Sequence, residues 1–371
     1  MNRVKFGDIV KDVKVNVDRM NNPYEYYVAG DHMDSEDLTI HRKGRFATDD
    51  VGPAFVRIFK PGQILYGSRR TYLKKVAVAD FSGICANTTF VFESKDHSIF
   101  DQRLLPFIML SDSFTSWSIS KSKGSTNPYV LFSDLADYEF DLPSLEEQKV
   151  LADKLWAAYR LKEGYKKLLC VTDEMVKSQF IEMLFKKPIT GKIGDLVDKK
   201  IFSVKKIHSM NDIIEYIDIS SVERSNHSIV ETTSYVVSNA PSRAQQCVRL
   251  DDILVSTVRP INRNIAVVNS DKNNLVASTG FCVLRPKLAF KEYLLAIVQS
   301  DKYTEAMIDK ASGGLYPAVN NGDVLNYGIY IPDEEFAKKF SLIYQQADKS
   351  KFELKQCIEN IDKVIKSLIN G

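Results

Sequence analysis

The chain has 371 residues and a formal net charge of +2, with 44% hydrophobic and 26% charged residues. This composition is typical of a globular protein, and a chain of this length usually forms more than one domain. No apolar stretch is long enough to cross a membrane and no signal peptide is evident, so we expect a cytoplasmic protein. The near-neutral charge excludes a strong overall field for nucleic acid, so any nucleic-acid surface must be a local cluster of cations.

Identical residues recur at a constant spacing of 189 positions. Pro143 and Pro332 form one such pair, because 332 minus 143 gives 189. The other identical pairs are Leu65 and Leu254, Ala77 and Ala266, Ser111 and Ser300, Asp112 and Asp301, Pro128 and Pro317, and Asp134 and Asp323. A solenoid repeat would recur every 20 to 50 residues or so. The longer spacing predicts a duplicated domain, and two related units imply two related targets.

Each copy is expected to begin with strands and to end with a helix, a loop and a last short strand. Short apolar runs between turn residues predict strands in segments such as "VAVADFSGICANTTFVF" and "IAVVNSDKNNLVASTGFCVL". A helix is expected around residues 103–114 and 291–308, followed by the loops "SKGSTNPY" and "ASGGLYPAVNNG". We therefore predict two mixed α/β domains, residues 1–143 and residues 188–332, and a fold of the α/β (α+β) class built by tandem duplication.

A different pattern follows each of the two prolines, over residues 144–187 and 333–371. Apolar positions there are separated by alternating steps of four and three, which is the spacing of a coiled-coil seam. The predicted seam consists of Leu151, Leu155, Ala158, Tyr165, Leu169, Val176, Phe340, Tyr344, Ala347, Leu354, Ile358, Ile361 and Ile365. Each stripe alone also fits a helix packed on its own domain, but two matching stripes are satisfied most simply by each other. We expect two long helices in an antiparallel coiled coil, with a pseudo-twofold axis relating the two copies.

Taken together, these features resemble the specificity subunit of type I restriction-modification systems. The resemblance covers essentially the whole chain, with "LPSLEEQKVLADKL" and "IPDEEFAKKFSLIY" at the starts of the two long helices. "ILYGSRRTYLKKVAV" and "SKGSTNPY" also look like this family's pattern. The second helix start departs from the first, with Phe336 and Ala337 where Glu147 and Gln148 stand, so a partner contact through those two side chains would be asymmetric.

The resemblance implies a non-catalytic subunit with two target recognition domains, each of which reads one half of a split, asymmetric DNA sequence. The coiled coil would set the spacer between the halves and dock two DNA adenine methyltransferase subunits, in a complex with two ATP-dependent restriction subunits. S-adenosylmethionine, ATP and magnesium would belong to those partners, and we expect no cofactor or metal in this chain. The chain has no Gly-x-x-x-x-Gly-Lys-Ser/Thr loop, so we do not expect it to hydrolyse ATP.

A protein that reads DNA needs cations for the phosphates and planar polar groups for the base edges. Candidates lie at matching intervals in both copies, first between two predicted strands and then in the later loop. They are Arg69, Arg70, Tyr72, Lys74, Lys75, Lys121, Lys123, Ser125 and Asn127 in the first copy, and Arg259, Asn262, Arg263, Asn264, Ser312 and Tyr316 in the second. Arginine can form two hydrogen bonds to guanine, and asparagine can do so to adenine. Ordinary solvated turns would also account for these residues.

Three other functions remain open. An orphan specificity subunit would compete with another subunit for the same methyltransferase, whereas a coiled-coil scaffold would bridge proteins without binding DNA. Asp80, Glu93 and Lys95 have the spacing of a metal-dependent endonuclease core, but the second copy does not retain them. The five cysteines and five histidines show no metal-ligand spacing. The "NNPY" and "TNPY" segments fit turns better than a methyltransferase motif.

Overall fold

The computed structural model describes residues 2–18, 21–198, 200–224, 227–287, 289–314 and 316–370. Contacts within the chain divide it into two compact units: Met1–Lys167 with Lys355–Gly371, and Leu168–Leu354. Each unit therefore combines a globular part with a piece of both long helices, α5 (Leu145–Phe185) and α10 (Glu334–Asn370). None of the described helices is long and apolar enough to cross a membrane.

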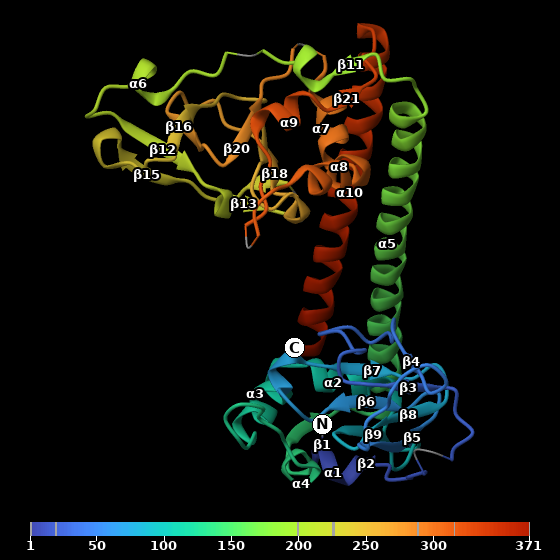
Figure 1. The fold of residues 1–371 in the computed structure, drawn as a ribbon. Helices are drawn as coiled ribbons and strands as arrows, with labels where there is room; N and C mark the ends of the chain where they lie inside the picture. The colour runs from blue at the N-terminus through green and yellow to red at the C-terminus, as the bar shows by residue number, and fades with distance from the viewer. Residues whose placement is uncertain are drawn as a thin grey trace. The chain divides into compact units, whose positions relative to one another are not determined.

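The globular part of the first unit contains three small sheets, with α3 and α4 at one side of them (Figure 1). The strand orders are β2-β9-β6-β7, β4-β3-β8-β5 and β1-β10. Its strands are β1 (Asn2–Lys5), β2 (Val10–Asp12), β3 (Tyr26–Val28), β4 (Gly44–Arg45), β5 (Phe55–Phe59), β6 (Ile64–Gly67), β7 (Val76–Val78), β8 (Gly83–Ala86), β9 (Thr89–Ser94) and β10 (Glu139–Leu142). Its helices are α1 (Phe6–Ile9), α2 (Leu105–Leu110), α3 (Asp112–Ser120) and α4 (Phe132–Ala136), with 3-10 turns η1 (Thr71–Leu73) and η2 (Gln102–Leu104).

The globular part of the second unit has the strand orders β18-β17-β20, β15-β12-β19-β16, β11-β21 and β13-β14. Its strands are β11 (Gly191–Lys192), β12 (Ile213–Ile217), β13 (Val222–Glu223), β14 (Ser228–Ile229), β15 (Thr233–Val236), β16 (Ala244–Cys247), β17 (Ile253–Ser256), β18 (Ile265–Val267), β19 (Leu275–Ser278), β20 (Phe281–Leu284) and β21 (Gly328–Ile329). Its helices are α6 (Val204–Ile207), α7 (Lys291–Gln299), α8 (Asp301–Lys310) and α9 (Asn321–Leu325), with 3-10 turns η3 (Ile193–Asp195), η4 (Ile219–Ser221), η5 (Val237–Asn239) and η6 (Pro260–Asn262). In each unit one sheet contains a parallel strand pair, β3 with β8 and β12 with β19. Both units are mixed α/β structures.

The prediction of one helix over residues 103–114 and one over 291–308 was wrong, because a serine divides each of them. Ser111 separates α2 from α3, and Ser300 separates α7 from α8. Both serines have extended backbones, with ψ of 153° and 152°. The Oγ of each accepts a hydrogen bond from the backbone N–H three residues later, at 3.2 Å in both units. Each serine therefore ends one helix and caps the next.

The start of α5 is determined by local hydrogen bonds. The Ser144 N–H donates to Glu147 Oε2 at 2.9 Å, and the Glu147 N–H donates to Ser144 Oγ at 3.4 Å, which is a capping box. Gln148 is 1% exposed and its Nε2 donates to the Ile99 and Pro143 carbonyls, both at 3.0 Å. Gln148 therefore anchors the start of α5 to the first unit. Because its side chain is buried there, it cannot contact a partner protein.

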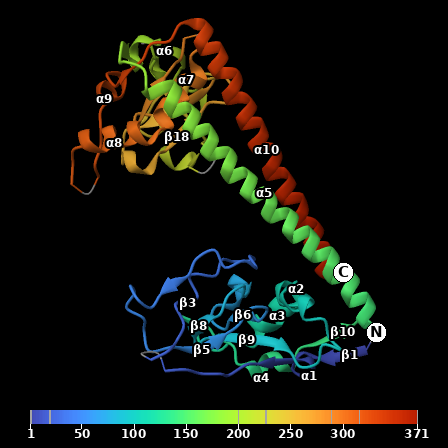
Figure 2. The ribbon, with the colours of Figure 1, turned by 90° about the vertical axis from the view of Figure 1, so that its right-hand side faces the viewer.

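Within each unit α5 and α10 lie alongside each other, as Figure 2 also shows. In the first unit Lys162 Nζ lies 2.6 Å from Asp362 Oδ1. In the second unit Phe180 packs on Phe340, with ring centroids 4.7 Å apart, and Lys351 pairs with Asp173. Every residue of the predicted seam is buried or half-buried. The two long helices are therefore consistent with a coiled coil.

Candidate nucleic-acid interface

Residues 69–75, between β6 and β7, fold into a tight turn that we call the first arginine turn. The Leu73 N–H donates to the Arg70 carbonyl at 2.8 Å, and the Lys74 N–H donates to the Thr71 carbonyl at 2.9 Å. Arg70 and Lys74 have left-handed backbones, with φ of 50° and 47°. This conformation costs a residue other than glycine about 1 kcal/mol or more, and such strain is concentrated at binding and catalytic sites. The turn is therefore a candidate functional site.

The later loop, residues 121–130, packs against the first arginine turn. The Arg70 N–H donates to the Pro128 carbonyl at 2.7 Å, and the Val130 N–H donates to the Ser68 carbonyl at 2.9 Å. Lys123 and Tyr129 exchange two backbone hydrogen bonds, at 2.8 and 2.9 Å, which close the loop. The structure thus brings together two groups of candidates that are about 50 residues apart in the sequence.

The side chains on this surface are mostly cationic or polar. The exposed candidates are Arg69, Arg70, Tyr72, Lys121, Lys123, Ser125 and Asn127. Lys123 Nζ is held 2.9 Å from Asp134 Oδ2, and Lys121 Nζ lies 4.6 Å from the centre of the Trp117 ring. Neither Arg69 nor Arg70 forms an ion pair with a residue that the structure describes. Their guanidinium groups are therefore available to a ligand.

Residues 258–264 form a second arginine turn with the same backbone geometry. Arg259 and Arg263 have φ of 49° and 50°, and they flank η6. The Arg259 N–H donates to the Pro317 carbonyl at 2.8 Å, and Ser312 and Ala318 exchange backbone hydrogen bonds of 3.0 and 2.9 Å. Each of these positions lies 189 residues after its counterpart in the first turn; for example, 259 minus 70 gives 189.

The second turn presents different side chains from the first. Arg259 is exposed, and its guanidinium lies 4.6 Å from the centre of the Tyr316 ring. This cation–π contact orients the plane of the guanidinium group. Ser312 is also exposed, and Asn262 is half-buried. Leu315, in the same loop, lies outside the described residues.

Besides Lys123, four further predicted contact residues are bonded within the protein, and each of them is buried or half-buried. Lys74 is paired with Glu36 and Asp112, both at 3.2 Å, and Lys75 donates to the Gly30 carbonyl. In the second unit Arg263 lies 2.6 Å from Asp301, and the buried Asn264 accepts a hydrogen bond from Arg224 at 2.9 Å. These side chains hold the turns in place, and their polar groups are engaged within the protein.

Two residues of the predicted nuclease core, Glu93 and Lys95, are bonded to other groups of the protein. Glu93 lies 2.8 Å from Lys11 and accepts a hydrogen bond from Gln63 at 2.7 Å. Lys95 donates to the Gly7 carbonyl. The geometry therefore gives no support to the nuclease hypothesis.

One group of potential metal ligands within the described residues is compact enough to hold an ion: Asp37, His41 and Glu163. Lys166 Nζ lies 2.8 Å from Asp37 Oδ2 and 2.9 Å from Glu163 Oε1, so one ammonium group already pairs with both carboxylates. Burial alone would raise the pKa of Asp37, but hydrogen bonds from Lys166, the Thr39 amide and Tyr159 lower it to about 2. Sequence analysis missed this cluster because Glu163 lies on α5, far along the chain from the other two residues.

The exposed groups of the two turns suit recognition of an acidic, planar ligand. Guanidinium and ammonium groups bind phosphates, and arginine and asparagine also reach base edges. Because the backbone of each turn is fixed by hydrogen bonds, these side chains are displayed from a rigid frame. Exposed cations on a fixed backbone are what a surface that binds DNA requires.

Comparison with known proteins shows which family part of the chain resembles. Residues 16–169 match the family described as type I restriction modification DNA specificity domain. The chain is 30% identical over 140 residues to the specificity subunit of the type I restriction enzyme HindI from Haemophilus influenzae. That alignment covers 36% of this chain and 30% of the relative, so the chain spans less than a third of that protein's length. The resemblance to type I specificity subunits is confirmed, with the family match lying in residues 16–169.

Two solved structures share the fold over nearly the whole chain. One is the type I restriction-modification S subunit from M. genitalium, with a TM-score of 0.59, 13% identity, and coverage of 99% of this chain and 94% of that one. The other comes from work on complex assembly and conformational transition of the type I R-M system, with a TM-score of 0.56, 17% identity, and coverage of 99% and 96%. At these identities the likeness shows the fold alone.

Proposed function

We propose that this chain is the DNA sequence-recognition subunit of a type I restriction-modification complex, and that residues 1–143 and 188–332 each read one half of a split, asymmetric target. The pair of arginine turns carries this proposal. Arg70 and Arg259 share one left-handed backbone, but Tyr72 in the first turn corresponds to Ile261 in the second. A constant backbone with different exposed side chains suits two readers of different base sequences.

The ion pairs of the long helices support an antiparallel pairing of duplicated segments. Lys162 pairs with Asp362, and Lys351 pairs with Asp173. The two lysines are 189 residues apart, and so are the two aspartates. Equivalent lysines thus pair with equivalent aspartates on the opposite helix, which is the pattern expected where two duplicated helices pair antiparallel. We infer that this coiled coil sets the spacer between the two half-sites.

The surface of α5 supports a role in docking partner subunits. Val150, Leu161, Leu168, Val171 and Met175 are each about half exposed. Apolar side chains gathered on an exposed surface often mark sites of protein interaction. We infer that this helix contributes to docking two DNA adenine methyltransferase subunits, and that two restriction subunits complete the complex. S-adenosylmethionine, ATP and magnesium would bind in those partners.

The test is to co-express this chain with a methyltransferase subunit of a type I system from the same organism and to map methyladenine along the host genome. We expect a split, asymmetric motif with a fixed gap, which would also give both half-sites. Co-purification of the two proteins without any methylation motif would contradict the proposal and favour an orphan or scaffold role.

A further inference from the structure

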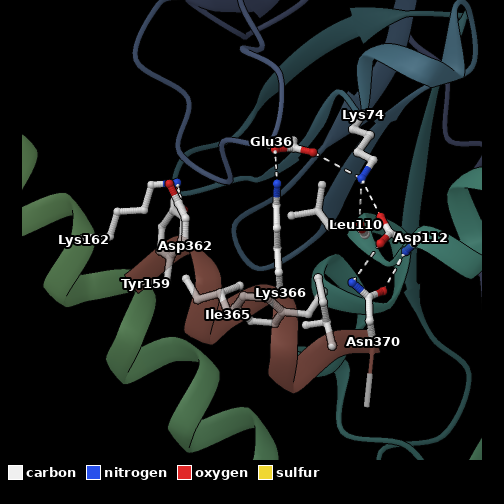
Figure 3. Close-up of a pocket in the computed structure, with 12 residues that line it drawn as sticks. Glu36, Lys74, Leu110, Asp112, Tyr159, Lys162, Asp362, Ile365, Lys366 and Asn370 are labelled. Carbon is white, nitrogen blue, oxygen red and sulfur yellow. Dashed lines mark hydrogen bonds and ion pairs between the residues drawn. The ribbon is translucent and has the colours of Figure 1, made fainter. Parts of the chain in front are cut away.

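The last turn of α10 is bonded to the first arginine turn through two carboxylates (Figure 3). Glu36 lies 3.2 Å from Lys74 Nζ through one oxygen and 3.9 Å from Lys366 Nζ through the other. Asp112 Oδ1 lies 3.2 Å from the same Lys74 Nζ, while Asp112 Oδ2 accepts a hydrogen bond from Asn370 Nδ2 at 3.1 Å. The Asp112 N–H also donates to Asn370 Oδ1 at 2.8 Å. Each carboxylate therefore links Lys74 to α10.

Lys74 is the point at which this network reaches the turn. Its side chain is 15% exposed, and its carbonyl accepts a hydrogen bond from the Glu36 N–H at 3.1 Å. Its backbone is left-handed, a conformation that persists only where surrounding contacts hold it. Lys74 ends the 3-10 turn that begins after Arg70, so a shift of Lys74 would move the exposed arginines as well.

The end of α10 is itself well anchored. Ile365 is 8% exposed, and Ile361, Leu368 and Ile369 pack against the core of the first unit. Lys74, Lys162 and Lys366 each lie beside a carboxylate, so the hollow between these residues offers no unpaired cation to an anionic ligand. The network is therefore suited to holding the turn in position. It lacks the unpaired cation that an anionic ligand would need.

We propose that Lys366 and Asn370 are positioning residues for DNA reading: through Glu36 and Asp112 they fix Lys74, and thereby the fidelity with which the first arginine turn reads its half-site. This inference rests on the proposed function. In the second unit Arg263 and Asp301 occupy the registers of Lys74 and Asp112 and pair directly. Asn370 is bonded to Asp112 of the first unit, so its loss should affect only one half of the target.

The experiment compares Asn370→Ala with the wild type in the complex co-expressed with the methyltransferase. Asn360→Ala is the matched control, because Asn360 is an exposed residue of the same helix that takes no part in this network. We expect Asn370→Ala to raise methylation at sites with one mismatch in the half-site of the first unit by roughly fivefold, because a mismatch then costs less. That half-site is identified as the one altered by Arg69→Ala. Methylation at mismatches in the other half should not change.

Coupling within the network gives a second readout. In an Asp112→Ala background, Asn370→Ala should have no further effect, because its link to Lys74 is already lost. Unchanged fidelity, or equal relaxation at both halves, would overturn the inference, as would a lower melting temperature with an unchanged motif. If the wild type itself gives no split motif, the proposed function fails and the inference fails with it; a split wild-type motif that the variant leaves unaltered defeats the inference alone.

Discussion

Replacing Arg69 and Arg70 together by alanine should weaken recognition of one half-site and leave the other intact. Both side chains are exposed and neither forms an ion pair within the described structure, so the substitution should change the free energy of unfolding by less than about 0.5 kcal/mol. Alanine keeps a β-carbon at position 70, where φ is 50°, so the backbone strain of the turn is preserved. The variant therefore tests recognition separately from folding.

The expected loss follows from the chemistry of arginine contacts. A bidentate contact to a base contributes about 1–3 kcal/mol of discrimination, so two such contacts contribute at least about 2 kcal/mol, or roughly thirtyfold in affinity. If the arginines bind phosphates instead, the loss of affinity is the same for every DNA sequence. The slope of the logarithm of the binding constant against the logarithm of the salt concentration then becomes smaller by about one for each arginine removed. Binding of the purified complex to duplexes with either half-site altered, measured at several salt concentrations, separates these cases.

Arg259→Ala is the matched control, because it removes the corresponding arginine of the second turn and should affect the opposite half-site. Equal loss at both halves in either variant would refute the assignment of one reader to each unit. Full retention of binding and of sequence preference by the Arg69→Ala, Arg70→Ala variant would refute the role of the first arginine turn.

Three further outcomes are expected. Deleting one heptad from both α5 and α10 should shorten the spacer of the methylated motif by about three base pairs, given about 1.5 Å per helical residue and about 3.4 Å per base pair; an unchanged spacer would mean that the helices do not set it. The Asp37 pKa of about 2 is below the usual value of 3.8, so this carboxylate should contribute about 2 kcal/mol to stability above pH 4, and the contribution should be lost as the pH falls through about 2. Unfolding measured between pH 5 and pH 2 should show a flatter profile for Asp37→Asn, and a profile identical to that of the wild type would contradict this assignment. Phe340→Ala should destabilise the protein by about 3–5 kcal/mol in chemical denaturation, because Phe340 is 0% exposed, whereas Leu342→Ala, at a position 62% exposed, should have little effect; equal effects would show that the apolar seam does not stabilise the helices.

The features that sequence analysis predicted well depend on local chemistry. Ser144 and Asp333 begin the long helices through hydrogen bonds that span only three residues. The repeat spacing likewise located the two arginine turns, since 189 separates Arg70 from Arg259. These inferences needed no knowledge of long-range packing.

The features that the sequence did not reveal depend on contacts between distant residues or on unusual backbones. Nothing about Arg70 or Lys74 indicates a left-handed conformation, because the residues that usually adopt it are glycine and asparagine. Asn370 meets Asp112 across 258 positions, and neither residue type marks a site by itself. The division of α5 and α10 between two units is also a property of packing, and periodicity along a single helix cannot show it.

The main-chain closure of the arginine turns has a consequence for how such a protein can change over time. The hydrogen bonds from Arg70 to Pro128 and from Arg259 to Pro317 use backbone atoms, so they persist when the side chains are replaced. Substitutions at Arg69 or Tyr72 thus alter what the turn touches without removing a bond on which the fold depends. Under the proposed function, new preferences would accumulate one residue at a time on an unchanged frame, and the two turns would diverge independently within one chain.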